Sequence, residues 1–211
     1  MEKYRLEGKT FVIDDYDKMP AFSSFLPGLA GVKGIPMWTF YTNRGQGMNS
    51  FGIDNKGNAI MEFNSANTAF ENTTVKGFRT FLKIDGEYYE PFFKYEKEAK
   101  RQIRMNKNSF KIIETNEKYG IEVTVNYFIL PNESIGALIR QVSVKNISDK
   151  AKDVEIIDGL PKIITYGISN GEFKEMSNLF KSWAYIKNID NKVPYYTLRA
   201  STKDSAEVSD V

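Results

Sequence analysis

Apolar and polar side chains alternate along the segment from Gly120 to Leu130. One side of this segment carries only large apolar residues: Ile121, Val123, Val125, Tyr127 and Ile129. The opposite side carries the polar residues Glu122, Thr124 and Asn126. A period of two residues is typical of a β-strand with one buried face. The segment therefore predicts a strand that lies on a hydrophobic core.

Further strand-like segments follow one another and are separated by turn residues. We expect strands at residues 5–13, 37–41, 50–53, 59–63, 74–84, 87–93, 109–115, 135–147, 152–157, 185–189 and 195–200. The dipeptide Asp85-Gly86 is a hairpin signal between two of them. Short strands with frequent turns favour an antiparallel β-sandwich over a βα repeat. The chain is therefore expected to be an all-β protein.

A different period occurs near the end of the chain. Between residues 171 and 183, large apolar residues recur at steps of three and four: Phe173, Met176, Leu179, Phe180 and Trp183. This spacing predicts one short helix, with Ser169 or Asn170 as its N-cap. Residues 19–36 and 64–72 are expected to form loops. The segment 94–104, which mixes charges of both signs, is expected to be a solvated connection or a short helix.

Composition limits the function classes. The chain has 211 residues, of which 41% are hydrophobic, 27% charged and 14% aromatic. A sandwich core accounts for most of the aromatic rings, and a ligand platform for a few at most. The net charge is +2 with both signs interspersed, which argues against a nucleic-acid partner. The start of the chain is charged and no apolar run is long enough to span a membrane, so a cytoplasmic protein is expected.

The chain contains no cysteine and no histidine. Disulfides, thiol nucleophiles, Ser-His pairs and zinc sites of the usual kind are thereby excluded. Carboxylates remain, in a cluster at Asp14, Asp15 and Asp17 and a pair at Asp204 and Glu207. Neither group adjoins an apolar segment that would separate the two pKa values for acid-base work. We therefore predict no catalytic residue, no metal site and no cofactor in this chain.

One glycine-punctuated loop is a candidate binding site. It reads Asn43-Arg44-Gly45-Gln46-Gly47 between two strand-like segments. Arginine donates several hydrogen bonds to carboxylate, phosphate or vicinal hydroxyls, and glycines allow a ligand to approach the backbone. The residues predicted to bind substrate are Trp38, Tyr41, Asn43, Arg44 and Gln46. The alternative is an ordinary hairpin tip, and the sequence is not that of a Walker loop.

Several longer stretches carry a resemblance to a known family. They are FLPGLAGVKGIPMW (25–38), YTNRGQGMNSFGIDNKGNAIMEF (41–63), GFRTF (77–81), DGLPKIITYG (158–167), FKEMSN (173–178) and RASTKDSAEV (199–208). Together they resemble the N-terminal part of the cellobiose-phosphorylase-like glycoside phosphorylases, glycoside hydrolase family ninety-four. Within that family the chain looks most like the long β-glucan phosphorylases.

The resemblance implies an N-terminal β-supersandwich, a helical linker, an (α/α)6 catalytic barrel and a small C-terminal β-layer. It also implies inverting phosphorolysis, in which inorganic phosphate is the co-substrate and α-glucose 1-phosphate the product. The family's catalytic Asp and phosphate site belong to the barrel, so this chain alone is expected to be inactive. The implied partners are the barrel and a β-glucan oligosaccharide, and sandwich loops in the family can also border a homodimer contact.

Residues 1–211 are therefore expected to form one N-terminal sandwich domain of a longer multidomain enzyme. The chain ends within alternating sequence at residues 204–211, which agrees with that expectation. The alternatives are a stand-alone carbohydrate-binding module and a structural or dimerisation domain. Affinity of the chain for glucan would favour the module, whereas an exposed apolar face would favour a domain that packs on a partner. Linkage specificity, acceptor length and oligomeric state stay open.

Overall fold

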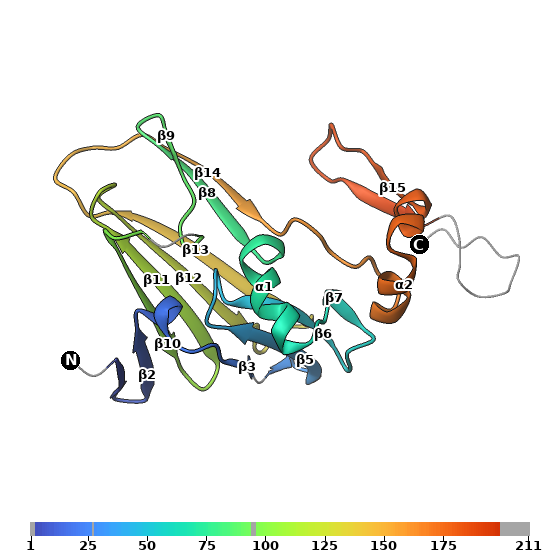
Figure 1. The fold of residues 1–211 in the computed structure, drawn as a ribbon. Helices are drawn as coiled ribbons and strands as arrows, with labels where there is room; N and C mark the ends of the chain where they lie inside the picture. The colour runs from blue at the N-terminus through green and yellow to red at the C-terminus, as the bar shows by residue number, and fades with distance from the viewer. Residues whose placement is uncertain (1–2, 27, 94–95, 199–211) are drawn as a thin grey trace, which may run out of the picture.

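Antiparallel strands form two facing layers in the computed structural model, which describes residues 3–26, 28–93 and 96–198 (Figure 1). The first layer is one six-stranded sheet in the order β1-β2-β10-β11-β12-β13. Its strands are β1 (Tyr4–Glu7), β2 (Thr10–Asp14), β10 (Ala99–Met105), β11 (Ser109–Asn116), β12 (Ile121–Ile129) and β13 (Leu138–Asn146). All of their pairings are antiparallel.

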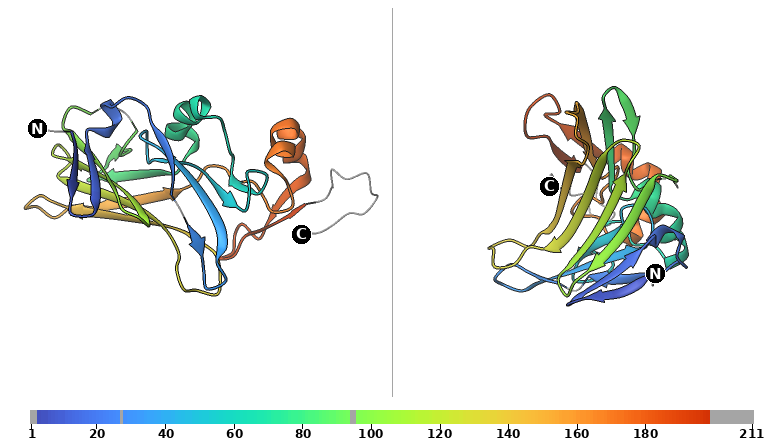
Figure 2. Two further views of the ribbon diagram at one scale, coloured as in Figure 1. Left: turned by 90° about the horizontal axis from the view of Figure 1, so that it is seen from below. Right: turned by 90° about the vertical axis from the view of Figure 1, so that its left-hand side faces the viewer.

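The second layer consists of two smaller sheets. The five-stranded sheet contains β3 (Ser23–Leu26), β4 (Leu29–Ala30), β5 (Ile35–Thr42), β6 (Met48–Ile53) and β7 (Ala59–Met61). The three-stranded sheet has the order β14-β8-β9 and contains β8 (Arg79–Ile84), β9 (Glu87–Tyr89) and β14 (Val154–Gly159). Figure 2 shows the two layers from two further sides. The expected all-β antiparallel sandwich is confirmed.

The main core lies between the layers and draws on both of them. The alternation along β12 places Ile121, Val123, Val125 and Tyr127 in this core, almost without exposure, while Ile129 at the strand end is partly buried. From the facing layer come Tyr41, Met48, Leu82, Ile84 and Tyr89. Burying one such side chain contributes about 1.5–3 kcal/mol. The face of β12 that the alternation predicts is therefore the face that holds the layers together.

Helix α1 (Ala66–Lys76) contradicts two expectations. Residues 64–72 were expected to form a loop and 74–84 a strand, but the helix covers most of the first segment and the start of the second. The strand β8 begins only at Arg79. The helix buries only Ala69 and Thr73, so it has no stripe of large apolar residues that a periodicity search could find. Figure 1 shows it lying across the five-stranded sheet.

Helix α2 (Asn170–Trp183) confirms the helix expected near residues 171–183. Ser169 is its N-cap and forms a capping box with Glu172. Its buried face belongs to a second, smaller core formed by Ala59, Ile164, Phe173, Phe180 and Leu198. A hairpin of β15 (Ala184–Lys187) and β16 (Tyr195–Leu198) follows the helix. Neither α-helix in the described part of the chain is long and apolar enough to cross a membrane.

Three further expectations were wrong. Residues 5–13 form two strands, because Gly8 has φ of +62° and closes a tight hairpin between β1 and β2. The expected loop 19–36 contains β3, β4 and the start of β5. The charged segment 94–104 holds most of β10, which lies in the sheet between β2 and β11. The mixed charges of this segment suggested exposure to solvent, but Arg101 is buried and paired with Glu114 inside the protein.

Candidate functional site

The loop between β5 and β6 is held by its own side chains. Asn43 is completely buried, and its amide nitrogen donates to the backbone oxygens of Tyr16 and Pro20, both at 3.0 Å. Its amide oxygen accepts a hydrogen bond from the backbone nitrogen of Phe22 at 2.9 Å. Since both ends of the amide are paired within the protein, Asn43 anchors the loop to the segment before β3.

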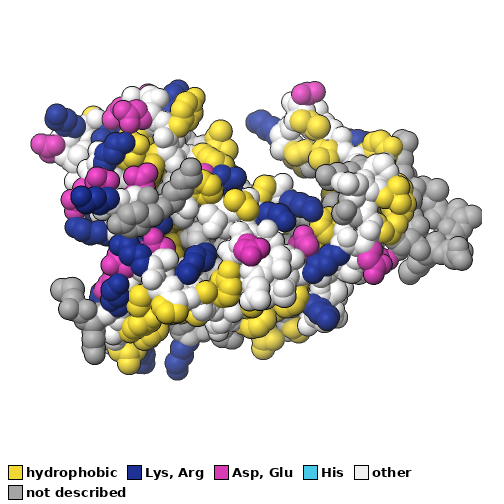
Figure 3. Space-filling model, viewed as in Figure 1, with side chains coloured by type: hydrophobic (Ala, Val, Ile, Leu, Met, Phe, Trp, Pro, Cys, Tyr) yellow, Lys and Arg dark blue, Asp and Glu magenta, His cyan; other side chains and the backbone are white. Residues whose placement is uncertain are grey.

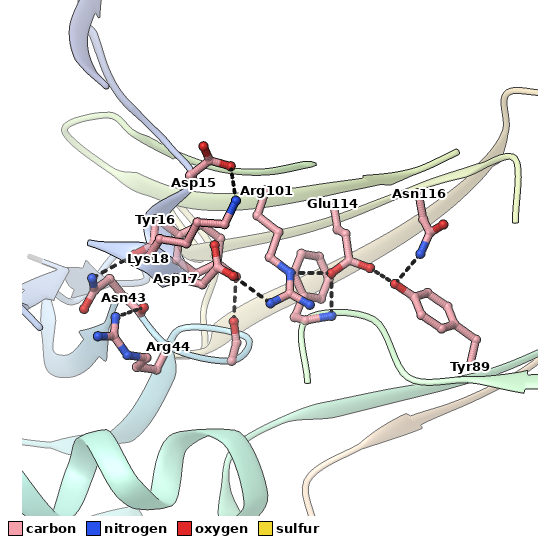
Figure 4. A network of polar contacts seen from close by, with 12 residues as sticks. Asp15, Tyr16, Asp17, Lys18, Asn43, Arg44, Tyr89, Arg101, Glu114 and Asn116 are labelled. Atoms are coloured by element: carbon pink, nitrogen blue, oxygen red, sulfur yellow. Dashed lines mark hydrogen bonds and ion pairs between the residues drawn. The ribbon is translucent and has the colours of Figure 1, made fainter. Parts of the chain in front are cut away.

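Arg44 lies beside this anchor and also binds backbone. Its guanidinium donates to the backbone oxygen of Asn43 at 2.8 Å (Figure 4) and to that of Met19 at 3.1 Å. The hydroxyl of Tyr16 donates to the backbone oxygen of Gly45 at 2.8 Å. The loop is therefore fixed on both sides by hydrogen bonds to the turn that follows β2.

Gln46 belongs to a polar cluster that joins the layers. Its amide nitrogen donates to Thr80 at 3.1 Å, and its amide oxygen accepts from Arg140 on β13. Arg140 also pairs with Asp158 on β14, and its guanidinium lies 5.0 Å from the ring centroid of Phe78. Arg140 on β13 thus connects the β5–β6 loop, β8 and β14, so the cluster stabilises the contact between the two layers.

The two aromatic residues predicted for the site lie on opposite sides of the five-stranded sheet. Tyr41 is buried in the main core and stacks on Phe110 with 4.4 Å between ring centroids. Burial raises the pKa of its hydroxyl. Trp38 packs against the second core and donates from its indole nitrogen to the backbone oxygen of Asn55 at 3.0 Å. The five predicted residues thus do not converge on one cavity, and their role in substrate binding stays a prediction.

A second buried network was not foreseen from the sequence. Glu114 has no exposure and accepts hydrogen bonds from Arg101 at 2.7 Å, from the backbone nitrogen of Phe92 at 2.7 Å and from the hydroxyl of Tyr89 (Figure 4). Arg101 also pairs with Asp17 at 3.0 Å. Burial and the neighbouring Glu114 carboxylate raise the pKa of Tyr89. Because no substrate can reach Glu114, this network holds the fold and does no acid-base chemistry.

The carboxylates singled out in the sequence are engaged with cations. Asp14 pairs with Arg5, Asp15 with Lys18, and Asp17 with Arg101. Asp204 and Glu207 lie outside the described residues. The contacts of Asp14 and Asp15 agree with the interpretation as turn and surface carboxylates, whereas Asp17 pairs with the buried Arg101 and only 17% of its side chain is exposed.

A small pocket with a cavity volume of about 30 Å³ lies between helix α1, the strands β6 and β7, and the segment that leads to α2. Its lining combines amides, charged groups and apolar side chains: Asn49, Met61, Glu62, Asn64, Asn72, Thr73, Lys76, Lys162, Ile163, Ile164 and Phe173. The sequence analysis missed it because α1 was taken for a loop. If α1 had been predicted as a helix, the four-residue spacing of Asn72 and Lys76 would have placed both side chains on the same helical face.

Large apolar side chains are exposed on the outer face of the three-stranded sheet. Tyr88 on β9 is 82% exposed and Ile157 on β14 is 73% exposed, and Ile157 lies opposite Phe81 on β8. Beyond the hollow to the right of this sheet in Figure 3, apolar residues are also exposed on α2 and its hairpin. These residues are Leu179, Tyr185, Ile186, Ile189, Val193 and Tyr195. Large exposed apolar patches mark interaction surfaces in soluble proteins.

No metal centre accompanies these features. Among the residues that the structure describes, no group of three or more Asp and Glu side chains is placed to hold a metal ion. The pocket beside α1 and the exposed apolar side chains are two features of the described residues that bear on function. A scan against protein-family models and a search of the curated proteins find no match for the chain.

Proposed function

We propose that this chain is the N-terminal sandwich domain of an inverting glycoside phosphorylase of glycoside hydrolase family ninety-four. The family assignment rests on the resemblance of the stretches at 25–38, 41–63 and 158–167. In this proposal the domain performs no chemistry itself. It packs on an (α/α)6 barrel that cleaves β-glucosidic bonds with inorganic phosphate and releases α-glucose 1-phosphate.

The observation that carries the proposal is the exposure of the apolar side chains of Phe81, Tyr88 and Ile157 on the outer face of the three-stranded sheet, beside the Lys83–Glu155 ion pair. Tyr88 and Ile157 are each more than two thirds exposed although they lie on a regular sheet, where a solvated face is normally polar. An exposed apolar face is the feature that separates a domain with a packing partner from a self-contained binding module. The partner that the resemblance supplies is the catalytic barrel.

The environments of Glu114 and of the three aspartates after β2 support the same assignment of the chemistry to the barrel. Inverting phosphorolysis needs one carboxylic acid that reaches the leaving oxygen and a site that places phosphate on the opposite face of the sugar. Within the described residues Glu114 is inaccessible, and Asp14, Asp15 and Asp17 are paired with Arg or Lys. In this proposal the barrel supplies the reacting groups.

The test compares the natural full-length protein with the 211-residue chain. Phosphate release from α-glucose 1-phosphate is measured with a panel of glucose and glucobiose acceptors. We expect release by the full-length protein with at least one acceptor and none by the chain alone, and the product gives the linkage. Release by the chain alone, or none by the full-length protein with any acceptor, would overturn the proposal.

A further inference from the structure

The strand β14 lies at an open edge of the three-stranded sheet. It pairs with β8 over all six of its residues, and no strand in the described part of the chain pairs with its other side. The pairing with β8 is regular, and β14 contains no proline. Backbone N–H and C=O groups that point away from the edge of a sheet are free to pair with another strand. β14 is therefore a place where a further strand can be added.

Both faces of β14 expose a large apolar side chain. Ile157 stands on the outer face opposite Phe81 of β8, and it is 73% exposed. Ile156 stands on the inner face opposite Leu82, which is buried, yet Ile156 is 51% exposed. Side chains on neighbouring strands of a sheet cover one another. One added strand would therefore shield both isoleucines.

The charges of β14 do not protect its edge. Edge strands normally avoid association through charged side chains, prolines, bulges or a short length. The charged residues of β14 are Glu155 and Asp158, and they pair with Lys83 and Arg140. Since both acids are neutralised within the domain, β14 has no unpaired charge. The strand β9, at the other edge of the same sheet, has only three residues.

The sequence of β14 is complementary to itself. In an antiparallel pair centred on Ile157, this residue lies opposite Ile157 of a second copy. Ile156 then lies opposite Asp158, and Glu155 opposite Gly159, so no acid faces an acid. A shift by half a step would place Glu155 opposite Asp158, where like charges repel. The centred register therefore brings the most exposed side chain of β14 into contact with its equivalent and avoids repulsion.

We propose that two copies of this chain associate through β14, in an antiparallel pair centred on Ile157. The two three-stranded sheets then form one continuous six-stranded sheet. A twofold pair leaves neither β14 edge open, so association stops at the dimer. Two six-residue strands bury less area than a standard protein interface, and the dimer is therefore weak and reversible. The inference concerns this chain alone and does not rest on the proposed phosphorylase role.

Sedimentation velocity of the chain at concentrations from about 10 µM to about 1 mM tests the association. We expect a monomer–dimer equilibrium with a Kd on the order of 100 µM. Ile157→Lys and Ile157→Glu each place two like charges in contact, and each should weaken dimerisation by about tenfold or more. An equimolar mixture of the two variants should dimerise again, because opposite charges then meet. A variant that merely lost its fold would not be rescued in this way.

The register is tested by cross-linking. The chain contains no cysteine, so one introduced cysteine is the only thiol present. Ile157→Cys should give a disulfide-linked dimer under mild oxidation, because directly opposed residues lie within reach of a disulfide. The matched control is Tyr88→Cys on β9, which is 82% exposed on the same face but lies away from the β14 edge, and it should cross-link little.

Three results would overturn the proposal. The first is a chain that stays monomeric up to the highest concentration. The second is a mixture of Ile157→Lys and Ile157→Glu that dimerises no better than either variant alone. The third is cross-linking of Tyr88→Cys as readily as of Ile157→Cys, which would show that contact between copies does not select β14.

Discussion

Asn43 and Asn49 lie six residues apart in one strand-loop-strand unit and are both buried, yet their surroundings are opposite. The amide of Asn43 is paired at both ends with backbone groups, whereas that of Asn49 has no partner among the described residues. The difference separates two uses of a buried polar group. A paired amide fixes the fold, whereas an unpaired amide provides no such anchor.

The largest loss of stability is expected when the buried ion pair of Glu114 and Arg101 is broken. Glu114→Gln leaves the guanidinium of Arg101 buried with less compensation, and breaking such a pair costs about 3–5 kcal/mol. Urea denaturation measures the free energy of unfolding. The control is Glu117→Gln in the exposed pair with Lys100, which should have little effect. Equal effects of the two variants would show that the Glu114 network does not hold the fold.

A smaller loss is expected for the paired amide. Asn43→Leu leaves the backbone nitrogen of Phe22 and the oxygens of Tyr16 and Pro20 without their partner. We expect the free energy of unfolding to fall by about 2–4 kcal/mol. Denaturant titration checks this value, and an unchanged midpoint would contradict the anchoring role of Asn43.

The same substitution at the unpaired amide should behave differently. Asn49→Leu removes a buried polar group that has no hydrogen bond to lose, in a volume that leucine fills similarly. We expect stability to stay within about 1 kcal/mol of the unchanged chain or to rise. A loss as large as that of Asn43→Leu would mean that Asn49 is paired within the protein.

The smallest effect on stability is expected on the apolar face. Tyr88→Ser changes a side chain that is 82% exposed, so the free energy of unfolding should change by about 0.5 kcal/mol or less. The same change should reduce aggregation of the isolated chain, measured by light scattering. A large loss of stability would show that Tyr88 packs within the domain rather than on a partner.

The sequence predicted elements whose burial follows a simple period. β12 was evident because Val123 and Val125 alternate with polar residues, and α2 because Phe173 and Phe180 recur on one helical face. α1 was missed because its buried face consists of Ala69 and Thr73, which form no hydrophobic stripe. β10 was missed because the charge of Arg101 is neutralised inside the protein.

The pocket could not be predicted from the sequence, for a different reason. It brings Asn49, Asn72 and Lys162 together from three distant parts of the chain. No local spacing relates these residues, so only the packing of α1 and of the segment before α2 beside β6 and β7 creates the pocket. The loop at Asn43, by contrast, drew attention through local glycines and an arginine, although its polar groups serve the fold.

The most direct test of the contrast between the two asparagines is urea denaturation of Asn43→Leu and Asn49→Leu side by side. The first variant removes hydrogen bonds to three backbone groups, whereas the second removes none to the described residues. We predict that the free energy of unfolding falls by about 2–4 kcal/mol in Asn43→Leu and by no more than about 1 kcal/mol in Asn49→Leu. Equal losses, or a larger loss in Asn49→Leu, would contradict the account.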